Sequence, residues 1–233
     1  MSRLHILSGG AAQGLIGGLA SVFKAKTGFD IAGEFGAVGT MADNLRGGTP
    51  TDIVVLTAAL VAKLAEEGLV DPATIVDIGL IETALAVRAG DPQVAAKDAA
   101  SLSEALLASD AIFVPDTKAS TAGIHVAKIL AQLGIADAVA SRLNVHPNGA
   151  TAMKHLAASD AKRPIGCTQT TEIINTPGVT LSGALPTGCE LATMYTAGVT
   201  ARTAHVAQAR TLIELLTGKG QDDLRGRAGF VAR

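Results

Sequence analysis

The stretch Leu4-His5-Ile6-Leu7-Ser8-Gly9-Gly10-Ala11-Ala12-Gln13-Gly14 joins a short apolar run to a Ser-Gly-Gly turn and then to a helical pattern. It predicts a strand, a tight turn and a helix that continues to about Lys26. The two glycines let the backbone bend with its N–H groups turned outward, at the positive end of the helix dipole. A small anion would fit on Ser8 and these amides. A strand-to-helix connection without a ligand explains the same turn equally well.

The same alternation of strand and helix continues along the chain. Strands are predicted at residues 29–35 and 52–56, with helices opening after Gly36 and at Ala58. A second series has strands at 111–114, 143–145 and 165–167 and helices at 121–133 and 149–158. Longer strand-like segments at 80–88 and 191–199 separate the two series, and a helix is expected at 203–217. This order predicts mostly parallel sheets with helices on both faces, whose loops meet at the carboxyl ends of the strands.

Composition and charge exclude several classes of protein. The 233 residues are 48% hydrophobic, with a formal net charge of −2 and only 3% aromatic residues. Neither a basic surface nor aromatic stacking platforms are present, so no nucleic-acid partner is expected. No membrane insertion is expected either.

Cysteines and the beginning of the chain bear on metals and location. Cys167 and Cys189 lie in no metal-ligand spacing, and both are interpreted as small core residues; they would pair only in an exported chain. We expect no metal and no other cofactor. Met1-Ser2-Arg3 leads directly into the first strand without a signal sequence, which predicts a cytoplasmic protein. An exported chain trimmed of its signal would look the same.

Three stretches resemble the type II periplasmic-binding-protein family, and within it the molybdate-binding branch. They are 35–42 with 45–53, 120–124 with 130–134, and 163–166. The resemblance implies an α/β fold of two lobes joined by two crossing strands, with a ligand cleft between them. Each lobe has a mostly parallel sheet flanked by helices. The expected lobes are residues 1–80 with 200–233, and residues 81–199.

The chain departs from this family at three side chains of the oxyanion site. Ala11 and Val38 stand where the family has serines, and Gln169 stands where it has a tyrosine. Each missing donor in a buried site costs about 1 kcal/mol or more, so we expect a small di- or tricarboxylate rather than molybdate. The expected ligand-binding residues are Ser8, Gly9, Gly10, Ala11, Val38, Thr40, Arg88, Ser120, Thr121, Ala122, Ala150, Thr168 and Gln169.

Other motifs are more similar to a divergent branch that includes aconitate isomerases: residues 7–10, 87–90 and 169–173. That resemblance implies isomerisation of a polycarboxylate by a 1,3-proton shift, which needs a base near one carbon and an acid near another. His146, at the end of a predicted strand, and Ser8 are the catalytic candidates; a solvent-facing loop histidine is the alternative for His146. The alternative function is a non-catalytic solute-binding protein for a small oxyanion or carboxylate, either a cytosolic sensor or, if the chain is exported, a receptor with an ABC permease as its partner.

Overall fold

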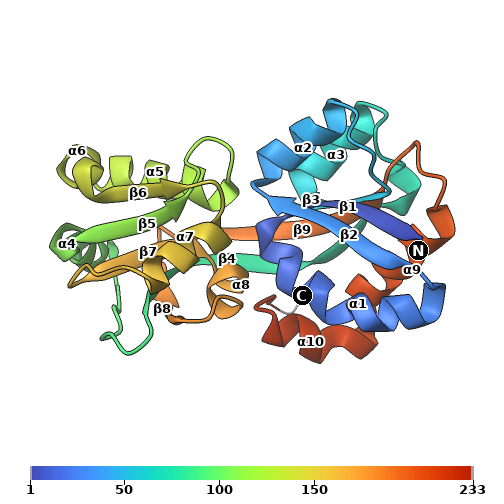
Figure 1. Ribbon diagram of the computed structural model, residues 1–233. Coiled ribbons are helices and arrows are strands. Elements are labelled where there is room, and N and C mark those ends of the chain that lie inside the picture. The colour runs from blue at the N-terminus through green and yellow to red at the C-terminus, as the bar shows by residue number, and fades with distance from the viewer. Residues whose placement is uncertain (1, 232–233) are drawn as a thin grey trace. The chain divides into compact units, whose positions relative to one another are not determined.

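The computed structural model describes residues 2–231 and divides into two compact units (Figure 1). Unit 1 contains the described residues up to Leu80 and from Thr193 onward, and unit 2 is Ile81–Ala192. The strands β4 (Val76–Arg88) and β9 (Ala192–Val199) carry the chain from one unit to the other. The α/β fold predicted from the sequence is confirmed, and the part of the sheet in each unit combines parallel strands with an antiparallel neighbour.

The sheet of unit 1 brings three parallel strands together in the order β2-β1-β3, with β9 antiparallel beside β3. Their bounds are β1 Arg3–Gly9, β2 Asp30–Gly36 and β3 Ile53–Thr57. Gly9 lies beside Gly36, and Ser8 lies between Phe35 and Val55. Because the strands are parallel, the turns that follow them all lie at the carboxyl edge of this sheet.

Helices cover both faces of the unit 1 sheet. In Figure 1, α2 and α3 lie on one face and α1, α9 and α10 on the other. All five residues of β3 are buried for this reason, as expected for a continuous apolar strand. The bounds are η1 Gly10–Ala12, α1 Gln13–Thr27, α2 Val38–Arg46, α3 Ala58–Glu66, η2 Pro72–Thr74, α9 Val206–Thr217, η4 Lys219–Gln221 and α10 Asp222–Arg227.

The sheet of unit 2 contains parallel strands β7, β5 and β6, with β4 antiparallel to β7 and also to β8. The strands are β5 Ala111–Pro115, β6 Leu143–His146, β7 Pro164–Gln169 and β8 Val179–Ala184. The helices are α4 Ala99–Ala108, α5 Thr121–Gln132, α6 Ala136–Val139, η3 Ala140–Arg142, α7 Gly149–Ala157 and α8 Thr170–Ile174. The sequence analysis missed β8, α4, α6 and α8.

Alternating side chains divide the core of unit 2 into two clusters. Leu85, Ile112 and Val114 pack with α4, α5 and α6 on one face of the sheet, while Ala84 and Phe113 pack with α7 and α8 on the other. Cys167 and Cys189 both belong to the first cluster as buried free thiols. Burial raises the pKa of Cys167 to about 12, so this thiol stays protonated.

The boundary between the units differs from the expected one at residues 193–199. The sequence analysis assigned this segment to the second lobe, whereas the structure assigns it to unit 1. The reason is strand pairing: Tyr195 to Val199 of β9 lie antiparallel to the whole of β3, from Thr57 back to Ile53. A strand that completes the unit 1 sheet folds with that unit.

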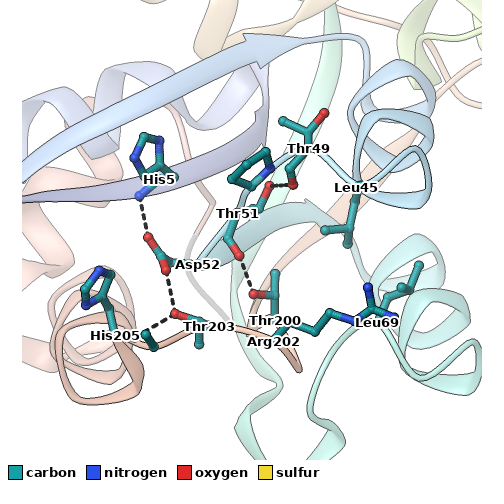
Figure 2. Close-up of a pocket in the computed structure, with 13 residues that line it drawn as sticks. His5, Leu45, Thr49, Thr51, Asp52, Leu69, Thr200, Arg202, Thr203 and His205 are labelled. Carbon is teal, nitrogen blue, oxygen red and sulfur yellow. Dashed lines mark hydrogen bonds between the residues drawn. The ribbon is translucent and has the colours of Figure 1, made fainter.

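At the amino ends of β1 and β3, a buried carboxylate joins three segments of unit 1 (Figure 2). Asp52 is 7% exposed and accepts hydrogen bonds from the His5 N–H at 2.7 Å and the Thr203 hydroxyl at 2.5 Å. The Thr200 N–H donates to the Asp52 carbonyl oxygen at 3.0 Å. Asp52 therefore fixes the loop before α9 against the amino ends of β1 and β3.

Replacing Asp52 with Ala should destabilise unit 1. The change leaves the His5 N–H and the Thr203 hydroxyl without their acceptor, at a cost of about 1–3 kcal/mol. Urea unfolding followed by circular dichroism measures this loss. Asp71→Ala is the matched control, because in the described residues the side chain of Asp71 accepts one exposed local bond, from the Ala73 N–H. An equal loss in both variants would contradict the bridging role of Asp52.

Candidate functional site

The carboxyl edge of unit 1 contains the first half of the predicted site. The buried Ser8 hydroxyl donates to the Gly9 carbonyl oxygen at 2.9 Å. A Cβ on Gly9 would lie 2.7 Å from Val38 Cγ1 and 2.8 Å from the Tyr195 ring. Glycine is therefore required where the two turns meet, and the structure brings Ser8, Gly9 and Val38 together as a cluster.

Helix starts at this edge present backbone N–H groups without side-chain caps. The N-cap residues are Gly9 for η1, Ala37 for α2 and Thr57 for α3, and none of them makes a side-chain capping bond. Gly10, Ala11 and Thr40 lie within the first turns of η1 and α2. Uncapped N–H groups at the positive ends of helices are suited to an anion.

In unit 2, α5 also begins without a side-chain cap. Its N-cap, Ser120, makes no side-chain capping bond, and Thr121 and Ala122 form the first turn. The preceding loop is held by Asp116, whose carboxylate accepts the N–H groups of Lys118 at 2.7 Å and Ala119 at 2.8 Å. These bonds lower the pKa of Asp116. The first turn of α5 is thus positioned by its own loop and left uncapped.

The start of α7 is different, because side chains of unit 2 already occupy it. The carboxyl group of Glu172 lies against Gly149, where a Cβ would be 1.9 Å from Glu172 Oε2, and the Thr151 N–H donates to Asn148 Oδ1 at 2.8 Å. Glu172 is 7% exposed and accepts the Thr168 hydroxyl at 2.5 Å. Burial raises the pKa of Glu172, although the Thr168 hydroxyl and the backbone N–H groups near its carboxyl group lower it.

Two predicted ligand residues, Thr168 and Arg88, have hydrogen-bond partners within unit 2. The Thr168 hydroxyl donates to Glu172 Oε2 at 2.5 Å, and Ala150 lies in the first turn of α7. Arg88 lies toward the amino end of β7, since Ala86 pairs with Gly166 and Thr83 with Gln169 at the opposite end. Its guanidinium forms an ion pair with Asp91 at 3.0 Å and donates to the carbonyl oxygens of Ser159 and Ala161.

Glu172 and Tyr195 lie at these edges but were not among the site residues predicted from the sequence. Glu172 belongs to the 169–173 motif, and its acidic side chain four residues after Thr168 was the available signal. Tyr195 is the single tyrosine of the chain, 1% exposed in β9 opposite Thr57. Each of these side chains contacts a turn that is distant from it in sequence. Local sequence patterns do not reveal such contacts.

His146 lies at the end of β6, where the sequence predicted it. Its ring stacks on His155, with centroids 4.2 Å apart, and lies 6.0 Å from the Phe113 ring. Burial and the neighbouring His155 lower the pKa of His146 below 6.5, and its Nε2 atom is buried without a hydrogen bond in the described residues. The ring is therefore neutral at physiological pH, the form in which an imidazole accepts a proton.

The lowered pKa of His146 should make unfolding depend on pH. The unfolded chain takes up a proton at this ring below about pH 6.5, while the folded chain does so only at lower pH, so stability falls as the pH decreases through this range. Chemical unfolding at constant ionic strength from pH 7.5 to 5 measures the effect. His146→Gln should show a smaller loss, and an unchanged loss would contradict the assignment.

Gly149 should tolerate no side chain. A Cβ there would lie 1.9 Å from Glu172 Oε2 and 2.1 Å from Thr168 Oγ1, so Gly149→Ala should cost at least about 2 kcal/mol. Gly17→Ala is the matched control: Gly17 lies inside α1 with nothing within 4 Å of the added Cβ. That change should be stabilising by about 0.5–1 kcal/mol. Thermal and urea unfolding of both variants compares them, and equal stabilities would contradict the packing argument.

A cavity of about 370 Å³ lies at the opposite, amino edge of unit 1 (Figure 2). Part of its polar lining is paired internally, through Asp52 and through the Thr51 hydroxyl, which donates to the Thr49 carbonyl oxygen. None of the predicted site residues lines it. The described residues contain no group of three or more side chains placed to hold a metal ion.

Among residues 2–231, no single helix is long and apolar enough to cross a membrane. Only the pair 121–132 and 136–142, bent by 119°, meets the criteria of length and composition.

The two α/β units, with uncapped helix starts at the carboxyl edges of their sheets, define a protein of the periplasmic-binding class. The sequence profile of the bacterial extracellular solute-binding protein family matches residues 4–231, and the chain belongs to this family. An aconitate isomerase from a Pseudomonas species is 25% identical over 230 residues, covering 94% of this chain and 84% of the relative.

Solved structures give the same fold. The periplasmic molybdate-binding protein of Azotobacter vinelandii superimposes with a TM-score of 0.83 at 18% identity, over 99% of each chain. The sulfate-binding protein SubI from Mycobacterium tuberculosis H37Rv has a TM-score of 0.75 at 18% identity, over 99% of this chain and 86% of that one. At this identity the likeness establishes the fold, and the resemblance predicted from the sequence is confirmed.

Proposed function

We propose that this solute-binding protein binds a small di- or tricarboxylate at the carboxyl edges of its sheets and isomerises it by a 1,3-proton shift, as an aconitate isomerase does. The observation that carries the proposal is the similarity to an aconitate isomerase along 94% of the chain. The open helix starts after β1, β2 and β3 and at α5 support it, because they offer backbone N–H donors to several carboxylates.

The side chains at these edges support a carboxylate over a tetrahedral oxyanion. Val38 and Ala11 are buried and apolar, so they offer no hydroxyl donors to an oxyanion shell. A polycarboxylate needs fewer converging donors at any one point, since its charges are distributed along the molecule. A thermal-shift screen of citrate, cis- and trans-aconitate, itaconate, molybdate, tungstate and sulfate tests this. We expect the aconitates to give the largest stabilisation, and a larger shift with molybdate would refute the ligand class.

In the reaction, a base removes a proton from the methylene carbon of aconitate, the double bond moves by one carbon, and a proton is delivered to the former methine carbon. Helix N-termini stabilise the negative charge that develops on the adjacent carboxylate. His146 is the proposed base, because its neutral ring can accept the proton. Ser8 is proposed to contact the substrate, for which its hydroxyl must exchange the Gly9 carbonyl for a ligand oxygen.

Incubation with cis- or trans-aconitate in D2O, followed by proton NMR, tests catalysis. We expect interconversion or deuterium incorporation at the methylene carbon. His146→Ala should reduce the rate by at least about 100-fold, the usual contribution of a general base, and Ser8→Ala should weaken binding. His205→Ala is the control, since His205 lines the amino-edge cavity. Tight binding without exchange over hours would leave a binding protein only.

The family itself favours a second candidate, a non-catalytic receptor for a small anion that delivers its ligand to an ABC permease. The NMR experiment separates the two functions, because a receptor binds the anion without exchanging its protons. The cytoplasmic location expected from the sequence stays a prediction, and detection of the chain outside the cytoplasmic membrane would favour the receptor.

A further inference from the structure

The amino-edge cavity of unit 1 has no part in the proposed function. Its volume of about 370 Å³ lies within the range of about 300–1,000 Å³ that small-molecule sites occupy. Two loops form most of it, residues 48–52 before β3 and residues 200–205 before α9. The Thr203 hydroxyl donates to the Asp52 carboxylate at 2.5 Å, and the Thr200 N–H donates to the Asp52 carbonyl oxygen at 3.0 Å. The two walls of the cavity are therefore fastened to each other.

Arg202 supplies a permanent positive charge to this cavity. Its side chain is exposed, and in the part of the chain that the structure describes its guanidinium forms no ion pair and no hydrogen bond. Arg46, by contrast, is paired with Glu67 at 2.8 Å. Figure 2 shows the Arg202 side chain extending toward Leu69 at one side of the cavity. A guanidinium with free N–H donors suits a carboxylate, which it can bind through two parallel hydrogen bonds.

Two imidazoles line the other side of the cavity, near Asp52 (Figure 2). The His205 ring packs edge-on against Phe29, with the ring centroids 5.1 Å apart and the planes at 69°. Within residues 2–231, the ring nitrogens of His5 and His205 make no hydrogen bond. A ring nitrogen that carries hydrogen can donate to a ligand oxygen. The cavity therefore offers polar contacts at two separate places.

The rest of the lining selects the charge and the body of a ligand. Leu45, Pro50 and Leu69 give the cavity apolar surface. Asp52 is 7% exposed, so a dianion such as phosphate would meet a buried negative charge, with Arg202 as the fixed cation to offset it. A single negative charge attached to an apolar body matches this lining better.

We propose that this cavity binds a small monocarboxylate with an apolar body. The carboxylate lies on Arg202, the body packs against Leu45 and Leu69, and an oxygen at the far end accepts a hydrogen bond from His5 or His205. All of the lining residues belong to unit 1, and none of the residues predicted for the carboxyl-edge site is among them. The site is thus a second one, and its test does not depend on the proposed function.

The first test follows the amide resonances of the ¹⁵N-labelled wild-type protein while sodium 4-hydroxybenzoate is added. We expect saturable shifts of the Thr51, Arg202 and Ala204 amides, while the Gly9 and Thr121 amides at the carboxyl edges stay in place. Sodium benzoate, which lacks the second oxygen, should bind several-fold more weakly, and 4-hydroxybenzyl alcohol, which lacks the carboxylate, at least about tenfold more weakly. No saturable shift at the cavity, or larger shifts at Gly9 or Thr121, would overturn the proposal.

Matched variants test the two polar contacts. Arg202→Gln should weaken 4-hydroxybenzoate binding by at least about tenfold, whereas Arg210→Gln, at an exposed position of α9, should leave it unchanged. His205→Phe keeps an aromatic ring against Phe29 but removes a donor, so it should reduce the preference for 4-hydroxybenzoate over benzoate. Circular dichroism melting of each variant checks that it is folded. Equal affinities of Arg202→Gln, Arg210→Gln and the wild type would refute the inference.

Discussion

The carboxyl group of Glu172 is the contact on which the carboxyl edge of unit 2 depends. It connects β7, α7 and α8, because it accepts the Thr168 hydroxyl at 2.5 Å and lies against Gly149, where a Cβ would be 1.9 Å from Glu172 Oε2. A buried carboxyl group is costly unless its oxygens are satisfied. Burial accordingly raises the pKa of Glu172, while the Thr168 hydroxyl and the nearby backbone N–H groups lower it.

At the carboxyl edge of unit 1, a small residue allows the turns to pack closely. Gly9 allows Val38 and the Tyr195 ring to pack where any side chain would collide. The helix starts after β1, β2 and β3 lack side-chain caps. In unit 2, the starts of α5 and α8 lack them as well, whereas Asn148 caps α7.

Ligand binding and catalysis place different chemical requirements on this fold. Binding alone needs donors that match the charges of the ligand, whereas a proton shift also needs a neutral base beside the bound carbon. The half-buried, stacked ring of His146 has the neutral form that such a base requires. The same fold occurs in a molybdate-binding and a sulfate-binding protein, so the fold alone does not decide between binding and catalysis.

The sequence by itself determined the family and the alternation of strands and helices outside β8, α4, α6 and α8, because apolar periodicity and glycine turns are local properties. The turns at Ser8, Val38 and Ser120 were found at the helix starts where the pattern placed them. Only the tertiary structure decided that Arg88 pairs with Asp91 away from the edge, that residues 193–199 complete the unit 1 sheet, and that Glu172 lies against Gly149 at the start of α7. Strand register and burial set these contacts, and both arise from pairing between segments that are far apart in the chain.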